Sequence, residues 1–403
     1  MSQLLDARLP IVAAPMAGGP STVALASAVA AAGALPFLAA GYKSPQAMAA
    51  EVEELRAHGY AFGVNLFVPS EDPVDAAAFA AYAAELQAEA DPFGLSLDSE
   101  HVADDDAWME KVAYLTENPV PVVSLTFGLP DAHDIAALQR VGTSVVANVT
   151  TPAEACLARD AGVDGLVVQG PDAGGHSATF DGTRTPDPLG TAELVRQVLD
   201  AVDLPVIAAG GVDGRNAVRS CLEAGAEAVA VGTLLLRADE AGTSPTHKRA
   251  LADPAFTETV ITRAFTGRPA RALRNGFIDR HEPNSLDAYP AVHHLTRALR
   301  QAAGKAGDAD RLHLWAGTGY RNAPGRACSR SHPPPSRGTV TSHAARNSER
   351  GPAVRRQLRT HSAAGHALLQ HSEHAGCPYA PRPDGVLLGR GAVQLRVCRQ
   401  GQR

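Results

Sequence analysis

Residues 167–176 read Val-Val-Gln-Gly-Pro-Asp-Ala-Gly-Gly-His, and the fold can be worked out from this stretch. It continues an apolar run, residues 165–168, that is typical of a buried strand, and it ends in a glycine-rich loop closed by His176. Glycine lets the backbone approach a bulky planar ligand, and histidine offers a base or donor that titrates near neutral pH. A strand that leads into such a loop is where an α/β barrel carries its catalytic groups.

Two later loops also follow a predicted strand and contain glycine. Residues 204–212 pass from a strand into Gly210 and Gly211, and residues 226–233 end at Gly232 and Thr233. Consecutive loops of this type form the phosphate site that follows the last two strands of an eight-stranded barrel, where backbone N–H groups and a helix N-terminus face the anion. The alternative is that these glycines only form tight strand-to-helix turns.

Eight short apolar runs predict strands, and amphipathic stretches between them predict helices. The strands are expected at residues 11–14, 35–38, 62–67, 120–126, 144–149, 165–168, 206–209 and 228–231. The helices include residues 21–32, 45–58, 132–140, 152–160, 191–201 and 215–224. Strands that alternate with helices form a parallel sheet, and eight such units close a (β/α)8 TIM barrel. The long connection after the third strand, residues 70–118, predicts an insertion that is irregular over residues 91–106, a candidate lid or oligomer contact.

Composition is compatible with a barrel enzyme. Apolar residues make up 45% of the chain, enough for a sizeable core. No apolar run approaches the roughly 20 residues of a membrane span, and the N-terminus lacks the pattern of a signal peptide. We therefore expect a cytoplasmic protein, monomer or homodimer, with no membrane partner.

The chain changes character near Arg321. Residues 321–403 contain 14 arginines, no lysine and 3 acidic residues, which leaves 22 basic and 40 acidic residues before them. The body is thus near −18 and the tail near +11. The tail has no sustained hydrophobic period, so we expect it to be disordered and its removal to leave the thermal stability unchanged or improved.

Two interpretations of this tail remain. It could be a basic arm for nucleic acid or an anionic membrane, or an out-of-frame reading of a GC-rich gene. The absence of lysine and the scarcity of aromatic residues favour the second, so no specific nucleic-acid partner is expected. Its cysteines and histidines have no zinc-finger spacing, and no metal site is assigned. The predicted domains are residues 1–320, catalytic, and residues 321–403.

Roughly residues 5–322 resemble the nitronate monooxygenases, formerly called 2-nitropropane dioxygenases, which are FMN-dependent TIM barrels. The matching stretches occur in family order: Ala-Ala-Pro-Met-Ala-Gly-Gly (13–19), Gly-Tyr-Lys (41–43), Gly-Val-Asn-Leu-Phe (63–67), Val-Ser-Leu-Thr-Phe-Gly (123–128), residues 168–176, Ala-Ala-Gly-Gly (208–211), Val-Gly-Thr (231–233) and Leu-Trp-Ala-Gly (314–317).

The resemblance implies a role for the residue at each matched position. Those expected to bind FMN are Met16, Asn65, Gln169, Gly174, Gly175, Gly210, Gly211, Val231, Gly232 and Thr233. Met16 would lie near the isoalloxazine, Gly174 would let the flavin chain pass, and the last two glycine loops would hold the phosphate. His176 would be the catalytic residue that faces the substrate.

The implied reaction is the oxidation of an alkyl nitronate or nitroalkane by O2, through FMN, to a carbonyl compound and nitrite. His176 would remove a proton from the carbon beside the nitro group, or anchor a pre-formed nitronate. Lys43 and Tyr289 are further candidates for anchoring the substrate anion. Ser177-Ala178 stands where the family commonly has Arg-Gly, and Pro171-Asp172 where a Glu is frequent, so the substrate's identity stays open.

Two alternatives are kept. An NAD(P)H-dependent FMN reductase similar to the enoyl-thioester reductases would share the barrel and the Ala-Gly-Gly-His loop. It would oxidise NADH steadily without a nitronate. A catalytically impaired product with an aberrant C-terminus would instead be colourless or insoluble.

Overall fold

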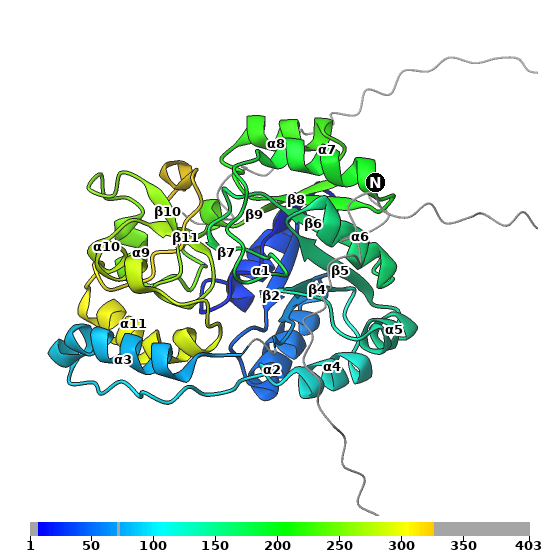
Figure 1. Ribbon diagram of the computed structural model, residues 1–403. Helices are drawn as coiled ribbons and strands as arrows, with labels where there is room; N and C mark the ends of the chain where they lie inside the picture. Colours follow the sequence, from blue (N-terminus) through cyan, green and yellow to red (C-terminus); the bar gives the residue numbers. More distant parts are fainter. Residues whose placement is uncertain (1–6, 71–72, 326–403) are drawn as a thin grey trace, which may run out of the picture.

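The computed structural model describes residues 7–70 and 73–325. Its centre is a closed barrel of eight parallel strands (Figure 1). In barrel order they are β1 (Ile11–Ala13), β2 (Leu35–Ala39), β3 (Gly63–Phe67), β4 (Val122–Thr126), β5 (Ser144–Val149), β6 (Gly165–Gln169), β8 (Val206–Ala209) and β9 (Ala228–Val231). Pairing of β9 with β1 closes the ring, with Val12 opposite Ala230. The predicted (β/α)8 barrel is confirmed, and the strand ends differ from the prediction by at most two residues.

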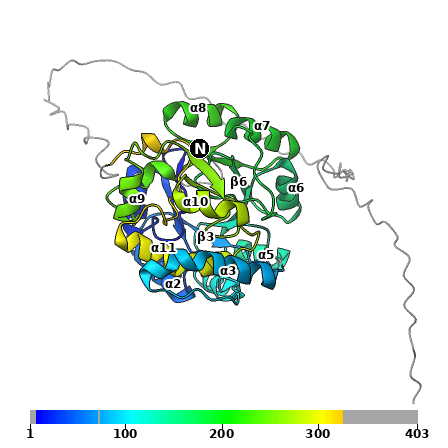
Figure 2. The ribbon, with the colours of Figure 1, turned by 60° about the vertical axis from the view of Figure 1, so that its left-hand side comes forward.

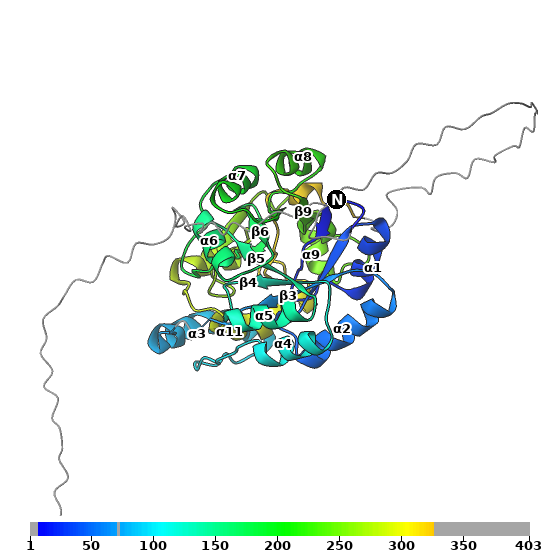
Figure 3. The ribbon, with the colours of Figure 1, turned by 90° about the vertical axis from the view of Figure 1, so that its right-hand side faces the viewer.

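Helices surround the barrel (Figure 3). They are α1 (Val23–Ala32), α2 (Pro45–Ala57), α4 (Trp108–Glu117), α5 (Ala132–Arg140), α6 (Pro152–Asp160), α7 (Thr191–Ala201) and α8 (Arg215–Glu223). Several begin at a side-chain cap, since the hydroxyls of Thr22, Ser44 and Thr151 each accept a hydrogen bond from a backbone N–H in the first turn. These capping residues therefore mark helix starts at the positions that the helical periodicity of the sequence predicts.

Alternate strand residues face opposite sides of the barrel wall. Val123 and Val145 pack outward under the helices, in the main core. Val122 and Val146 pack inward, in a separate cluster with Phe37 and others. These inward side chains fill the barrel interior, as in other barrels of this size. Ligand space is therefore confined to the mouth at the carboxyl ends of the strands.

A second body of structure covers this mouth (Figures 1 and 2). It combines the insertion after β3 with the chain that follows β9. Its elements are α3 (Ala76–Ala90), α9 (Pro245–Ala250), β10 (Thr259–Thr262), β11 (Ala270–Leu273), α10 (Gly276–His281) and α11 (Ala291–Ala306). β11 pairs with β10 and with a short strand of the glycine-rich loop, β7 (Gly175–His176). The insertion was predicted, whereas α3 and this three-stranded sheet were not.

The covering structure has its own hydrophobic core. Phe79, Tyr82 and Leu86 of α3 pack with buried side chains of α10 and α11. Figure 1 shows α3 and α11 side by side. Tyr82 adds a polar tie, because its hydroxyl donates to the carbonyl of Ala264 at 2.7 Å. The insertion therefore stabilises the segment that closes the cavity.

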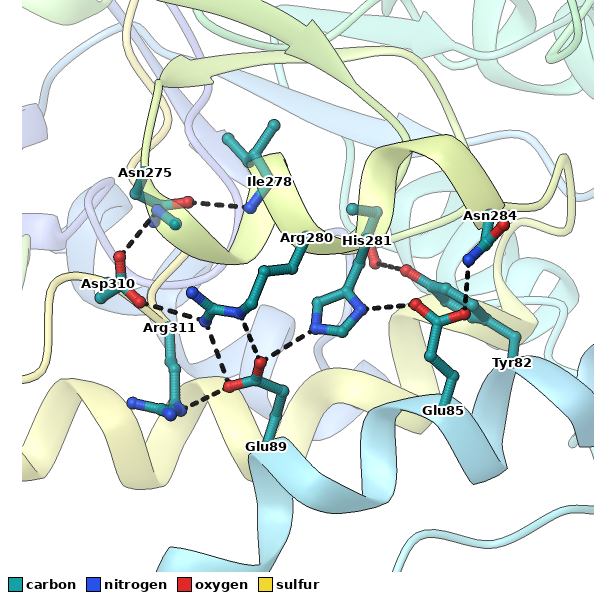
Figure 4. Close-up of polar contacts among 12 residues, drawn as sticks. Tyr82, Glu85, Glu89, Asn275, Ile278, Arg280, His281, Asn284, Asp310 and Arg311 are labelled. Carbon is teal, nitrogen blue, oxygen red and sulfur yellow. Dashed lines mark hydrogen bonds and ion pairs between the residues drawn. The ribbon is translucent and has the colours of Figure 1, made fainter.

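A cluster of ion pairs also joins α3 to α10 (Figure 4). Glu89 accepts from Arg280 at 2.7 Å and from His281 Nε2 at 3.0 Å, and it meets Arg311 at 2.6 Å. The second ring nitrogen of His281 lies 2.6 Å from Glu85. Burial alone would raise the pKa of Glu89, but hydrogen bonds from Arg280 and His281 hold that pKa at about 2.

The folded chain continues a little beyond Tyr320. The carbonyl of Ala323 accepts from Arg237 at 2.8 Å, and the amide of Asn322 donates to the carbonyl of Asp213 at 3.2 Å. Residues 321–323, which the sequence assigned to the tail, thus pack on the barrel, and a truncation should end after Gly325. The remainder of the predicted tail, residues 326–403, lies outside the described residues. Within the residues that are described, no helix has the length and apolar character to cross a bilayer.

Replacing Glu89 by Gln should lower the free energy of unfolding by about 2 kcal/mol at pH 7, because charged hydrogen bonds are lost. A carboxyl group whose pKa is lower in the folded than in the unfolded protein stabilises the fold at pH values above the unfolded pKa. That stabilisation is lost as the pH falls through the folded pKa. The difference in Tm should therefore shrink between about pH 4.3 and pH 2. Calorimetry across that range tests this, with exposed Glu117→Gln as the control. A pH-independent difference would contradict it.

Candidate active site

A cavity of about 1090 Å³ lies at the carboxyl ends of the barrel strands, beneath α11. All but one of the residues predicted to bind FMN or to catalyse line it: Met16, Asn65, Gln169, Gly174, Gly175, His176, Gly210, Gly211, Gly232 and Thr233. The exception is Val231, whose carbonyl accepts from the N–H of Ala14 at 3.0 Å within the barrel. Residues far apart in the chain are thus brought to one cavity.

Polar side chains follow one another around the mouth. Asn65 of β3, Thr126 of β4 and Asn148 of β5 form a row, in which the Asn65 and Asn148 amides each donate to the Thr126 hydroxyl, at 3.0 and 2.9 Å. Beneath them, the hydroxyl of Ser124 is buried with no hydrogen-bond partner. A ligand with polar atoms along one edge fits this row. Thr126 and Asn148 were not singled out from the sequence, although each is a polar residue in an apolar strand, as Asn65 is.

The side chain of Gln169 hydrogen-bonds to the backbone of the loop that carries His176. Its amide Nε2 donates to the carbonyl of His176 at 3.2 Å, and its Oε1 accepts from the N–H of Ala178 at 2.8 Å. These contacts fix the backbone on both sides of Ser177. The side chain predicted to bind the flavin therefore also sets the position of the catalytic candidate.

Backbone geometry explains the glycines of the cavity. Gly210 and Gly211 have φ of 95° and 69°, where a side chain is strained. A Cβ on Gly210 would lie 2.7 Å from the carbonyl oxygen of Gly170. At Gly174 a Cβ would lie 2.4 Å from the backbone nitrogen of Gly317. A side chain at Gly174 is therefore excluded by the protein's own chain, and the role of Gly174 beside the flavin stays a prediction.

His176 is enclosed by aromatic side chains. Its ring lies 5.3 Å from Trp315, 5.7 Å from Tyr289 and 5.8 Å from Phe127, between ring centroids. Its Nε2 lies 3.0 Å from the hydroxyl of Thr266. The histidine was expected to titrate near neutral pH, and that expectation was wrong. Burial, followed by the positive charges of Arg268 and Arg300, lowers its pKa to about 3, so the imidazole is neutral.

Phe127 and a further aromatic residue of the cavity, Tyr42, have strained backbones. Phe127 has φ of 82° and Tyr42 has φ of 67°, a region that non-glycine residues avoid and that often marks functional sites. Both rings contact Phe67, with centroids 4.6 and 5.2 Å away. The backbone of Tyr42 is fixed by a hydrogen bond, which its N–H donates to the carboxylate of Asp106 at 2.8 Å. The strained backbones of Phe127 and Tyr42 therefore hold these rings in an aromatic wall of the cavity near His176.

The two predicted substrate anchors already have partners. Lys43 forms an ion pair of 2.5 Å with Glu51. The hydroxyl of Tyr289 donates to that of Tyr42 at 3.1 Å. The buried cations nearest this wall are instead Arg268, 4.2 Å over the ring of Phe127, and Arg300. Both lie after the barrel, where no sequence motif distinguished them.

The family model of nitronate monooxygenase matches residues 2–326. The chain belongs to the nitronate monooxygenase family. A probable nitronate monooxygenase of Staphylococcus saprophyticus is 37% identical, over 79% of this chain and 91% of the relative. One from Staphylococcus aureus is 33% identical, over 80% and 92%. The resemblance inferred from the sequence is confirmed, and the chain is a flavin-dependent oxidoreductase.

Solved structures agree with this assignment. Nitroalkane oxidase from Streptomyces ansochromogenes is 46% identical with a TM-score of 0.77, over 80% of this chain and 93% of that one. FabK from Thermotoga maritima is 26% identical with a TM-score of 0.61, over 80% and 89%. A flavin of this family also fits the cavity's chemistry, since the polar row, the unpartnered Ser124 hydroxyl and the bare backbone at Gly210 and Gly211 suit a planar ring that bears a phosphate.

Replacing Gly210 by Ala should lower both Tm and the flavin content of the purified protein, because the new Cβ meets the Gly170 carbonyl at positive φ. Gly232→Ala is the matched control. It has an ordinary φ of −114°, and its Cβ would have 3.6 Å to the nearest atom, so its Tm should stay near that of the wild type. Equal losses of Tm in the two variants would contradict this account of the loop.

Proposed function

We propose that this chain binds FMN in the cavity and uses it, with O2, to oxidise alkyl nitronates to a carbonyl compound and nitrite. The observation that carries the proposal is a neutral His176 in the same cavity as the Gly210-Gly211 and Gly232-Thr233 loops, in a member of this family. The catalytic domain would comprise the described chain to about Ala323.

The two loops support FMN as the flavin. Gly210-Gly211 and Gly232-Thr233 make one phosphate cradle, and no Gly-x-Gly-x-x-Gly fingerprint follows a strand to hold a second phosphate and an adenosine. Asn65 and Asn148 would hydrogen-bond the polar edge of the ring. When bound, FMN accepts electrons from the substrate carbon and passes them to O2.

The state of His176 bears on which substrate form is used. A neutral imidazole can accept a proton or a hydrogen bond, but one whose pKa is about 3 is a weak base at neutral pH. Proton removal from a neutral nitroalkane is therefore unfavourable, whereas a nitronate arrives without that proton. We infer that nitronates are the better substrates; His176 would orient them, and would serve as a weak base when the substrate is a neutral nitroalkane.

His176→Asn should leave flavin binding intact and reduce turnover of neutral nitroalkanes more than turnover of nitronates, because only the former need a base. A general base contributes about 10²–10⁴-fold, and the low pKa of His176 puts the expected loss near 10²-fold. Nitrite release from nitroethane and from ethyl nitronate measures both. If the ratio of the two rates is unchanged, His176 is not the base.

Heating the yellow protein should release FMN and no FAD, because the chain offers a single phosphate cradle. Chromatography of the supernatant against both standards decides this, and recovery of FAD would refute the assignment. NADH oxidation without a nitronate is the companion assay. A steady rate there would favour the NAD(P)H-dependent reductase instead.

A further inference from the structure

Arg300 of α11 is buried in the cavity wall, and no carboxylate among the described residues pairs with it. Its side chain is 5% exposed and lines the cavity. The guanidinium donates from Nε to the Thr296 hydroxyl at 2.9 Å, and from Nη2 to the carbonyl of His293 at 2.9 Å and to His293 Nδ1 at 3.2 Å. All three acceptors are uncharged.

Other arginines of the same region are paired. Arg263 meets Asp287 at 2.5 Å, and Arg280 and Arg311 both meet Glu89. Burial lowers the pKa of Arg300 to about 10, so it remains charged at neutral pH. A buried cation without a counterion is unfavourable, because nothing offsets the cost of removing it from water. An anionic ligand in the cavity would offset that penalty.

His293 supplies a second donor beside it. Because arginine can only donate, Nδ1 of His293 must accept from Arg300. Burial and the charge of Arg300 lower the pKa of His293 well below its ordinary value, so the ring is neutral and its proton resides on Nε2. That Nε2 is buried with no hydrogen-bond partner, and the residue lines the cavity. The ring is fixed by stacking on Tyr42, with centroids 3.9 Å apart.

We propose that Arg300 and the Nε2–H of His293 form an oxyanion site that holds the two oxygens of the nitronate group. A planar oxyanion accepts donors from a guanidinium and a neighbouring N–H in the same way as a carboxylate does. The site selects the anionic substrate over the neutral nitroalkane, since only the anion compensates the buried charge. The identity of the anion rests on the proposed function; the existence of the site does not.

Nitrate, which is planar and bears oxygens on nitrogen, is the probe for the site. Tm of the flavin-loaded protein is measured with sodium nitrate and with sodium chloride at equal ionic strength, over a concentration series. Nitrate should raise Tm of the wild type, and Arg300→Met should weaken nitrate binding by about ten- to a hundred-fold, as expected for loss of charged hydrogen bonds. His293→Phe keeps the stacked ring and should weaken it less. Exposed Arg219→Met on α8 is the charge control.

Without nitrate, Arg300→Met should have a Tm at or above that of the wild type, because an uncompensated buried charge is removed. If that variant does not fold, Arg300→Lys, which retains the charge but not the forked geometry, carries the test with a smaller loss. Equal nitrate stabilisation in the wild type and the Arg300 variants would overturn the proposal.

A kinetic arm separates this site from the proposed function. Arg300→Met should lower kcat/KM for ethyl nitronate, whose only anionic group is the nitronate, and change that for nitroethane less. A normal kcat/KM for ethyl nitronate in this variant would overturn the assignment to the nitronate group. If the wild type oxidises no nitronate yet nitrate stabilises it through Arg300, the proposed function fails and the oxyanion site stands.

Discussion

Burial of the side chains in the wall over the barrel mouth determines the charge states in the cavity. It keeps His176 and His293 neutral, whereas Arg300, whose pKa falls only to about 10, stays charged with uncharged hydrogen-bond acceptors. A solvated mouth would screen these charges, and the histidines would titrate near neutral pH. The charge states of these side chains therefore depend on α11, which lines the cavity over the strands.

Contacts distant from the site hold the structure that covers the barrel mouth in place. The insertion helix α3 packs on α10 and α11, and Glu89 joins it to Arg280 and Arg311 by ion pairs. Closer in, Gln169 holds the loop on either side of His176 from within the barrel. Under the proposed function, the strand ends and their loops would supply the cofactor's contacts, and the covering structure would supply Arg300 and His293 on the substrate side. This division explains how one barrel can keep its flavin and change its substrate.

The sequence predicted the part of the molecule that is encoded locally. The barrel strands are short apolar runs bounded by glycine, and Asn65, Gly210 and His176 sit at strand ends, so pattern and position agree. Other features depend on contacts between distant segments. Gly174 is glycine because residue 317 passes it, and β7 exists only because β11 lies beside it. Likewise, nothing near Arg300 in the chain reveals that it is buried and unpaired, and the pKa of His176 reflects neighbours ninety or more residues away.

Anaerobic titration of the purified yellow protein tests the central claim most directly, because it asks where the electrons of the bound flavin come from. With oxygen removed, ethyl nitronate should bleach the visible flavin absorbance in a single rapid phase, and readmitted air should restore the colour with release of nitrite. NADH added in the same way should leave the spectrum unchanged. Bleaching by NADH, with none by the nitronate, would contradict the account.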